Sequence, residues 1–158
     1  MNQQQISKAL SLAYFYLKFR PRTEQEIVRY LEKKSIRFHF SEVVIKTTIE
    51  TLKEQGFIND KKFVELYVEN RILLKPKGIF LLRYELAKLG IAKDLIEEYF
   101  STSQTEDLTL AEDVLRRRIN TYAALDSKTR FKKAVSFLLR RGFSYDIAKK
   151  AYQTVFTV

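Results

Sequence analysis

The chain has 158 residues, 46% of them hydrophobic, and its 29 Lys plus Arg outnumber its 19 Asp plus Glu, for a formal net charge of +10. This hydrophobic content excludes wholesale disorder, and the absence of cysteine excludes disulfides and zinc sites built on thiolates. The charge favours a polyanionic partner, either nucleic acid or an acidic protein surface. With only 4 Gly and 2 Pro, the sequence predicts long helices with short connections rather than a sheet.

The first third of the chain predicts three helices, with approximate ranges 6–19, 23–34 and 41–55. Pro21 ends the first helix. Thr23 and Glu26 form a capping box that opens the second, which we expect to end near Lys34, with a loop over residues 35–40. Gly56 stops the third helix.

The middle of the chain predicts two helices back to back, over 59–74 and 78–89, and a short third over 92–100. The side chains expected to face inward from the first are Phe63, Leu66, Tyr67 and Leu74. Those of the second step by three and four residues and therefore share one face: Ile79, Leu82, Leu86 and Leu89. Gly90 ends this helix, since glycine adopts the left-handed conformation without steric cost.

The polar segment 101–105 has no apolar anchor and predicts a flexible joint. Beyond it we expect a helix from about 106 to Tyr122, one opened by Asp126 or Ser127 and stopped at Gly142, and a last one capped by Ser144. The total is about nine helices.

These helices fall into three groups of three, over 1–58, 59–100 and 106–158. We align Ile36, Ile91 and Phe143 as the apolar residue after each middle helix, at spacings of 55 and 52 residues, which indicates an insertion in the first copy. The prediction is an all-α chain of tandem three-helix repeats, elongated and curved. The alternative is three unrelated helical stretches that share amphipathic patterning.

Catalytic motifs are missing from the sequence. His39, the sole histidine, lies beside Arg37 and Phe38 with no evident partner, and isolated glycines cannot build a phosphate-binding loop. We therefore expect neither an enzyme nor a cofactor. No apolar run approaches the ~20 residues that span a bilayer, so we expect no membrane segment. The absence of cysteine suits a reducing compartment, and we expect a cytoplasmic protein.

The excess of basic over acidic residues is largest after residue 100, where 11 basic residues accompany 6 acidic ones. Arginine forks match phosphate and carboxylate alike, so these cations are candidate contacts to an anionic partner. Aromatic residues interleave with them and suggest base stacking or core packing: Phe131, Phe137, Phe143 and Tyr145. The candidate binding residues along the chain are Arg71, Arg83, Arg116, Arg117, Arg118, Lys128, Arg130, Lys132, Lys133, Arg140, Arg141, Lys149 and Lys150.

Two motifs carry a family resemblance. The run Asn59-Asp60-x2-Phe63-x3-Tyr67-Val68-x2-Arg71, followed by Gly78-x3-Leu82-x2-Glu85-Leu86-x2-Leu89-Gly90-Ile91, resembles the central motif of the RecX regulatory proteins. Arg140-Arg141-Gly142-Phe143 resembles a motif near their C-terminus.

The resemblance implies a non-enzymatic modulator of the RecA recombinase in recombination, repair and the SOS response. Such proteins bind in the groove of the RecA–DNA filament, restrain its ATPase and strand exchange, and also contact single- and double-stranded DNA. We expect a monomer of this kind. Two alternatives stay open: a stand-alone basic DNA-binding protein, and a helical-repeat scaffold for another acidic partner.

Overall fold

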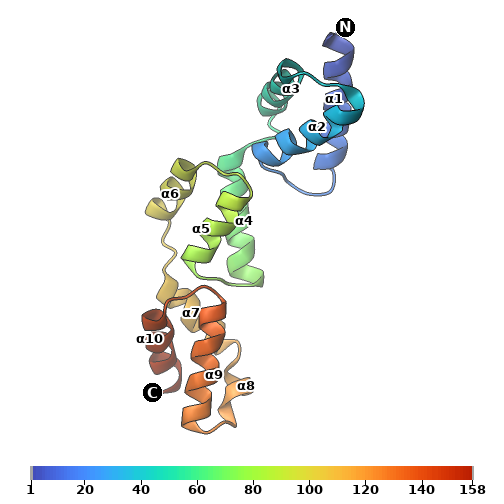
Figure 1. The fold of residues 1–158 in the computed structure, drawn as a ribbon. Coiled ribbons are helices and arrows are strands. Elements are labelled where there is room, and N and C mark those ends of the chain that lie inside the picture. The colour runs from blue at the N-terminus through green and yellow to red at the C-terminus, as the bar shows by residue number, and fades with distance from the viewer. Residues whose placement is uncertain (1, 158) are drawn as a thin grey trace. The chain divides into compact units, whose positions relative to one another are not determined.

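The computed structural model describes residues 2–157, which form ten α-helices and no strand (Figure 1). The all-α class and the succession of three-helix groups are confirmed. The helices are α1 Asn2–Leu17, α2 Glu24–Phe38, α3 Glu42–Glu54, α4 Asp60–Leu74, α5 Ile79–Lys88, α6 Lys93–Thr102, α7 Asp107–Arg116, α8 Ile119–Ala123, α9 Ser127–Arg140 and α10 Tyr145–Phe156.

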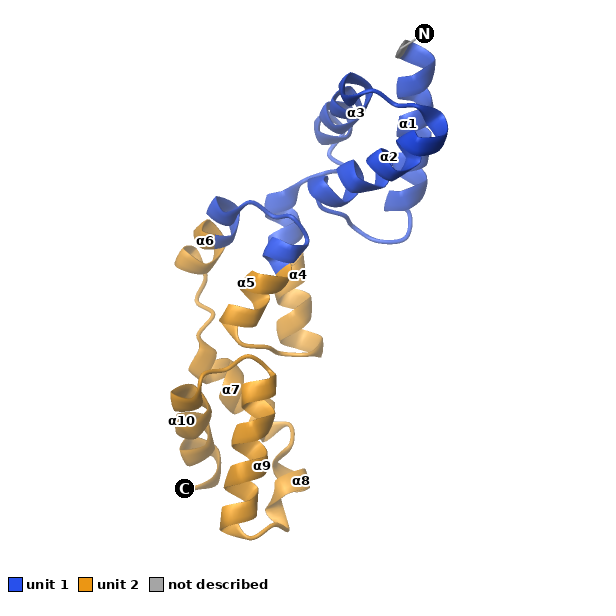
Figure 2. Cartoon of the chain, in the orientation of Figure 1, with its two compact units in different colours: residues 1–65, 86–96 blue, residues 66–85, 97–158 orange. Residues whose placement is uncertain are grey.

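The chain divides into two compact units, coloured separately in Figure 2. Unit 1 holds residues 1–65 and 86–96, and unit 2 holds residues 66–85 and 97–158. In unit 1, α1 packs against α2 and α3 around a core of Ala9, Ala13, Ile27, Leu31, Phe40, Val44, Ile49, Leu52 and Ile58. In unit 2, α10 packs against α7 and α9, and the core includes Leu110, Val114, Leu115, Val135, Leu138, Phe143, Ala148 and Tyr152. Each unit thus has its own hydrophobic core.

The expected helix caps are present. Thr23 and Glu26 form the capping box of α2, and the side chains of Ser41, Asp126 and Ser144 each accept a backbone N–H at the start of their helices. Gly56, Gly90 and Gly142 take positive φ where the sequence predicts helix ends. Local sequence therefore sets most of the boundaries.

The predicted end of α2 is wrong. The helix continues through residues 35–38, which we expected to be loop, and ends at His39, a left-handed residue with φ 55°. Ile36 lies inside the helix and is 80% exposed, whereas Phe40 is buried and follows the left-handed residue as Ile91 and Phe143 do. Phe40, Ile91 and Phe143 lie 51 and 52 residues apart, so the first copy has no insertion.

Three smaller predictions also differ from the structure. The helix expected from about 106 to Tyr122 is broken at residues 117–118. Its second part is the separate helix α8, which brings the number of helices in residues 2–157 to ten rather than nine. Leu66 and Leu74 are 41% and 77% exposed, because the buried face of α4 is offset and carries Phe63, Val64 and Val68. α6 includes residues 101 and 102 of the segment predicted as a joint, whose flexibility stays a prediction.

Two hydrogen bonds from distant residues hold the start of α2 in unit 1. The Thr23 hydroxyl donates to the Leu89 carbonyl at the end of α5, over 2.7 Å. The Glu24 N–H, the first of α2, donates to the Asp60 carboxylate at the start of α4, over 2.9 Å. Backbone groups that a helix N-terminus leaves unsatisfied are thus bonded by residues distant in sequence.

Unit 2 has an equivalent pair of hydrogen bonds, one helix group further along the chain. The Gly78 N–H donates to the Arg141 carbonyl at the end of α9, over 2.9 Å. The Ile79 N–H, the first of α5, donates to the Asp107 carboxylate at the start of α7, over 2.7 Å. In both units one bond goes to a carbonyl at the end of a helix, from Thr23 or from Gly78, and one goes from the first amide of a helix to an aspartate. This recurrence supports a structural repeat.

Replacing Thr23 with alanine is expected to lower the free energy of unfolding of unit 1 by about 2 kcal/mol. The buried hydroxyl accepts from the Glu26 N–H and donates to the Leu89 carbonyl, so both groups would lose a partner. Urea denaturation followed by far-UV circular dichroism measures the loss. Ser41→Ala removes an exposed cap of α3 and should cost only about 1 kcal/mol. Equal losses would contradict a role for the Leu89 bond.

Candidate anion-binding site

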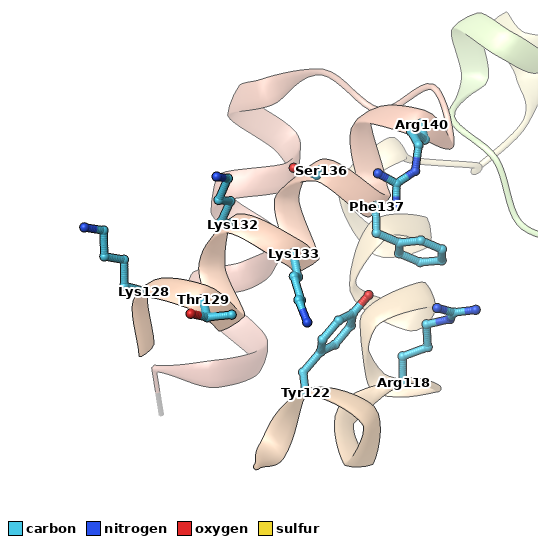
Figure 3. A pocket seen from close by; sticks show the side chains of 9 residues that line it. All are labelled: Arg118, Tyr122, Lys128, Thr129, Lys132, Lys133, Ser136, Phe137 and Arg140. Carbon is cyan, nitrogen blue, oxygen red and sulfur yellow. The ribbon is translucent and has the colours of Figure 1, made fainter. Parts of the chain in front are cut away.

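A hollow of about 750 Å³ opens on unit 2, between α9 and the segment that leads through α8 (Figure 3). Five of its lining residues are cationic, and none is acidic. The residues that line it, here called the basic hollow, are Arg118, Tyr122, Lys128, Thr129, Lys132, Lys133, Ser136, Phe137 and Arg140. Five positive charges without a lining carboxylate make this a candidate site for an anion.

Helix α9 supplies one side of the basic hollow because its two faces differ. Ala134, Val135 and Leu138 are buried in the core of unit 2. The opposite face carries a residue of the hollow at each of four successive turns: Lys128, Lys132, Ser136 and Arg140. A step of four residues advances about 6 Å along a helix, so this row extends about 18 Å.

The break between α7 and α8 supplies the other side. Arg118 lies in the break, with φ −116° and ψ 9°, and its guanidinium lies 4.3 Å from the centre of the Phe137 ring. The Arg141 guanidinium lies 5.1 Å from the same ring. Burial, and to a smaller degree the charge of Arg118, lowers the pKa of Arg141. The two arginines therefore contact Phe137, which is only 8% exposed.

Tyr122 is the polar group at the floor of the basic hollow. Its side chain is 5% exposed, and its ring packs edge-on against Phe156, with ring centres 6.2 Å apart. Figure 3 shows its hydroxyl directed into the hollow, with Lys133 and Arg118 on either side of the ring. Within residues 2–157 this hydroxyl is neither bonded to a side chain nor among the fully buried polar atoms that lack a partner, so it is open to solvent. Packing thus holds an available hydroxyl in place.

The predicted candidates separate into three groups. Arg118, Lys128, Lys132, Lys133 and Arg140 come together in the basic hollow. Most of the others are engaged within the protein: Arg71 with Glu85, Arg83 with Glu97, Arg116 with Glu112, and Arg117, Arg130 and Arg141 with the carbonyls of Leu73, Leu125 and Pro76. Lys149 and Lys150 are exposed on α10, outside the hollow.

The interleaved aromatic residues offer little surface for base stacking. Phe137 and Phe143 are buried, Phe131 is half-buried against Tyr152, and Tyr145 is 53% exposed. Tyr122 is not among the binding residues that the sequence predicts, although its place one helical turn after Arg118 is a usable signal. Within the described residues no group of three metal-ligating side chains comes together, and no helix is long and apolar enough to span a lipid bilayer.

Comparison with known proteins identifies the family. Residues 59–99 match a family model described as the second three-helix domain of RecX, and residues 105–152 match its third three-helix domain. The chain belongs to the RecX family. The family resemblance of the central and C-terminal motifs is therefore confirmed.

Individual RecX proteins resemble the chain over most of its length. The regulatory protein RecX of Streptococcus gordonii is 32% identical over 94% of this chain, and that of Staphylococcus carnosus is 31% identical over 92%. The chain spans about half the length of these curated relatives, 56% and 53% respectively. The crystal structure of RecX from Lactobacillus salivarius is 26% identical, with a TM-score of 0.79 and 99% of both chains covered.

Proposed function

We propose that this RecX chain regulates DNA recombination by binding the filament that RecA forms on DNA and restraining its ATPase and strand exchange. The protein acts as a monomer in the cytoplasm, without catalytic chemistry of its own. The basic hollow is its contact to the nucleic acid of the filament. Arg140 lines the hollow, and Arg141 packs against the ring of Phe137, which also lines it.

The observation that carries this proposal is a RecX fold with an unneutralised cationic hollow. Its relatives are named regulatory proteins, and the described residues hold no cluster suited to a metal. A filament of protein on DNA presents both phosphate and acidic side chains, so a cationic surface is attracted to it by long-range electrostatics.

Adding the purified chain to RecA on single-stranded DNA is expected to slow ATP hydrolysis at near-stoichiometric amounts. The double variant Lys128→Ala/Lys132→Ala should need roughly tenfold more protein for the same slowing, because two contacts to phosphate are lost. A coupled assay of ATP turnover across a titration measures both effects.

The double variant Lys149→Ala/Lys150→Ala is the matched control, since it removes the same charge from exposed helical positions outside the basic hollow. It should act like the parent protein. An unchanged ATPase rate with the folded parent chain in excess would refute the proposed function. Equal weakening by both double variants would assign the effect to net charge rather than to the hollow.

A further inference from the structure

We propose that a groove between α2 and α3 of unit 1 is a docking site for a basic amphipathic helix of a partner protein. This groove, here called the acidic groove, has a volume of about 420 Å³. Its apolar lining residues are Val28, Ile45 and Ile49. Its charged lining residues are Glu24, Glu32, Glu42, Lys46, Glu50 and Lys53. The inference goes beyond the proposed function, because it adds a protein-binding face to the chain.

The acidic groove lies on a face of the helix pair that α1 leaves open. α1 packs against α2 and α3 on the side of these helices that forms the core of unit 1. On the groove face, Glu24, Val28 and Glu32 follow one another at one-turn steps along α2. The lining of α3 runs from Glu42 to Lys53, a length of about 16 Å or roughly three helical turns. A partner helix of similar length fits along this groove.

The aliphatic lining favours a helix over other conformations of a bound peptide. Val28 and Ile45 are half-buried, and Ile49 is 5% exposed. None of the described lining residues is aromatic, so the groove lacks the rings on which proline-rich segments dock. Residues 2–157 form no strand, so an extended peptide has no sheet edge to join. An amphipathic helix, with apolar side chains at i, i+3, i+4 and i+7, is the mode that fits.

The charges of the acidic groove favour a basic partner. Four carboxylates and two ammonium groups line it, so its lining is net negative in a chain whose formal charge is +10. Both ammonium groups are already engaged, Lys53 with Glu24 over 2.6 Å and Lys46 with Glu50 over 4.0 Å. Glu32 and Glu42 form no ion pair within residues 2–157. Lysine or arginine of a partner helix would pair with these two carboxylates, whereas phosphate would be repelled.

Apolar surface continues beyond the acidic groove, toward the end where α2 leads into α3. Ile36 follows Glu32 by one turn of α2 and is 80% exposed. Val43 follows Glu42 in the first turn of α3 and is 64% exposed. A helix that covered Ile36 and Val43 would remove apolar surface from water, a contribution that charge alone does not supply.

A synthetic peptide tests the proposal with the whole chain. The probe is a fluorescein-labelled peptide of about 14 residues, with leucine at helical spacing on one face and lysine near both ends. Because such a short helix is marginal in water, we expect saturable binding by fluorescence anisotropy together with a gain of helical circular dichroism signal. Replacing its leucines with serine, at unchanged charge, should weaken binding at least tenfold, roughly 1.4 kcal/mol, because the apolar face is lost.

The double variant Glu32→Gln/Glu42→Gln should bind the leucine peptide about tenfold more weakly, because both carboxylates lack an internal partner and would pair with the peptide. Glu54→Gln/Glu65→Gln is the matched control, since it removes the same charge from exposed positions of unit 1 outside the groove. The control should bind within about twofold of the parent chain. Equal weakening by the two double variants, or equal binding of the serine peptide, would overturn the proposal.

Two further measurements locate and identify the occupant. Peptide-induced changes in backbone amide NMR signals should centre on α2 and α3, and changes centred elsewhere would overturn the proposal. Self-association of the parent chain in sedimentation, abolished by Glu32→Gln/Glu42→Gln, would also overturn it, in favour of a second copy as the occupant. No recombinase or nucleic acid is present in these experiments, so their outcome is independent of the proposed function.

Discussion

Gly78→Ala is expected to lower the free energy of unfolding of unit 2 by about 3 kcal/mol. A methyl group at this position would lie 2.6 Å from the carbonyl carbon of Gly142 and closer still to its oxygen. Both contacts are with backbone, so no flexible side chain can move aside, and the hydrogen bond from the Gly78 N–H to the Arg141 carbonyl would be strained as well. Urea denaturation followed by circular dichroism gives the free energy.

Gly56→Ala is the control that separates close approach from backbone conformation. Gly56 has φ +76°, and a methyl group there would have nothing within 4 Å. It should cost only about 1 kcal/mol, the penalty of the left-handed conformation. Gly142→Ala combines φ +85° with a contact of 2.6 Å to Leu81 and should cost at least as much as Gly78→Ala. If Gly78→Ala proved no more harmful than Gly56→Ala, the close packing of residues 78 and 142 would be refuted.

Glu85→Gln is expected to cost about 2 kcal/mol at neutral pH, because Glu85 is the centre of an ion-pair cluster in unit 2. Its carboxylate accepts from the Tyr67 hydroxyl over 2.9 Å and from Lys77, and the Arg71 side chain lies 3.6 Å away. The side chains of Glu85 and Lys77 are 21% and 15% exposed. Glutamine would keep the acceptor for Tyr67 and leave Lys77 with its charge unpaired.

The cost should depend on pH in a defined direction. Burial by itself would raise the pKa of Glu85, but the hydrogen bonds from Lys77 and Tyr67 and the charges of Lys77 and Arg71 outweigh it, so the pKa is lowered. A lowered pKa stabilises the fold above the unfolded value of 4.5, and this stabilisation is lost as the pH falls through the folded value. The difference between parent and Glu85→Gln should therefore be full at pH 7 and shrink as the pH falls below about 4.5.

Glu97→Gln provides the comparison for an exposed ion pair. Glu97 bonds Arg83 in the same unit, but its side chain is 50% exposed. Solvent screens such a pair, so the loss should be under about 0.5 kcal/mol at any pH. A difference between parent and Glu85→Gln that stayed constant between pH 7 and about pH 3 would contradict the role assigned to the charge of Glu85.

The basic hollow shows how far composition predicts a site. The excess of lysine and arginine after residue 100 predicts every cation of the basic hollow as a candidate, because so many charged side chains cannot all be buried. It could not separate Lys128 and Lys132, which line the hollow, from Arg117 and Arg130, which donate to backbone carbonyls. That distinction depends on which side of each helix faces a neighbour.

His39 illustrates a second limit. Glycine marks the left-handed end of α5 and of α9, so the sequence pattern located both. In α2 a histidine takes that conformation with φ 55°, and no local signal announces it. Once Phe40 is known to be buried in the core of unit 1, the repeat becomes regular at 51 and 52 residues.

The sequence by itself determined what is local: the helical class, the caps at Thr23, Ser41 and Ser144, the glycine stops, and the excess of cations. These follow from backbone conformation and from hydrogen bonds within one turn. Only the tertiary structure shows that Asp60 and Asp107 accept hydrogen bonds from the first amides of distant helices. It alone also shows that Tyr122 lines the hollow. Those depend on contacts between residues far apart in the chain, which no local pattern specifies.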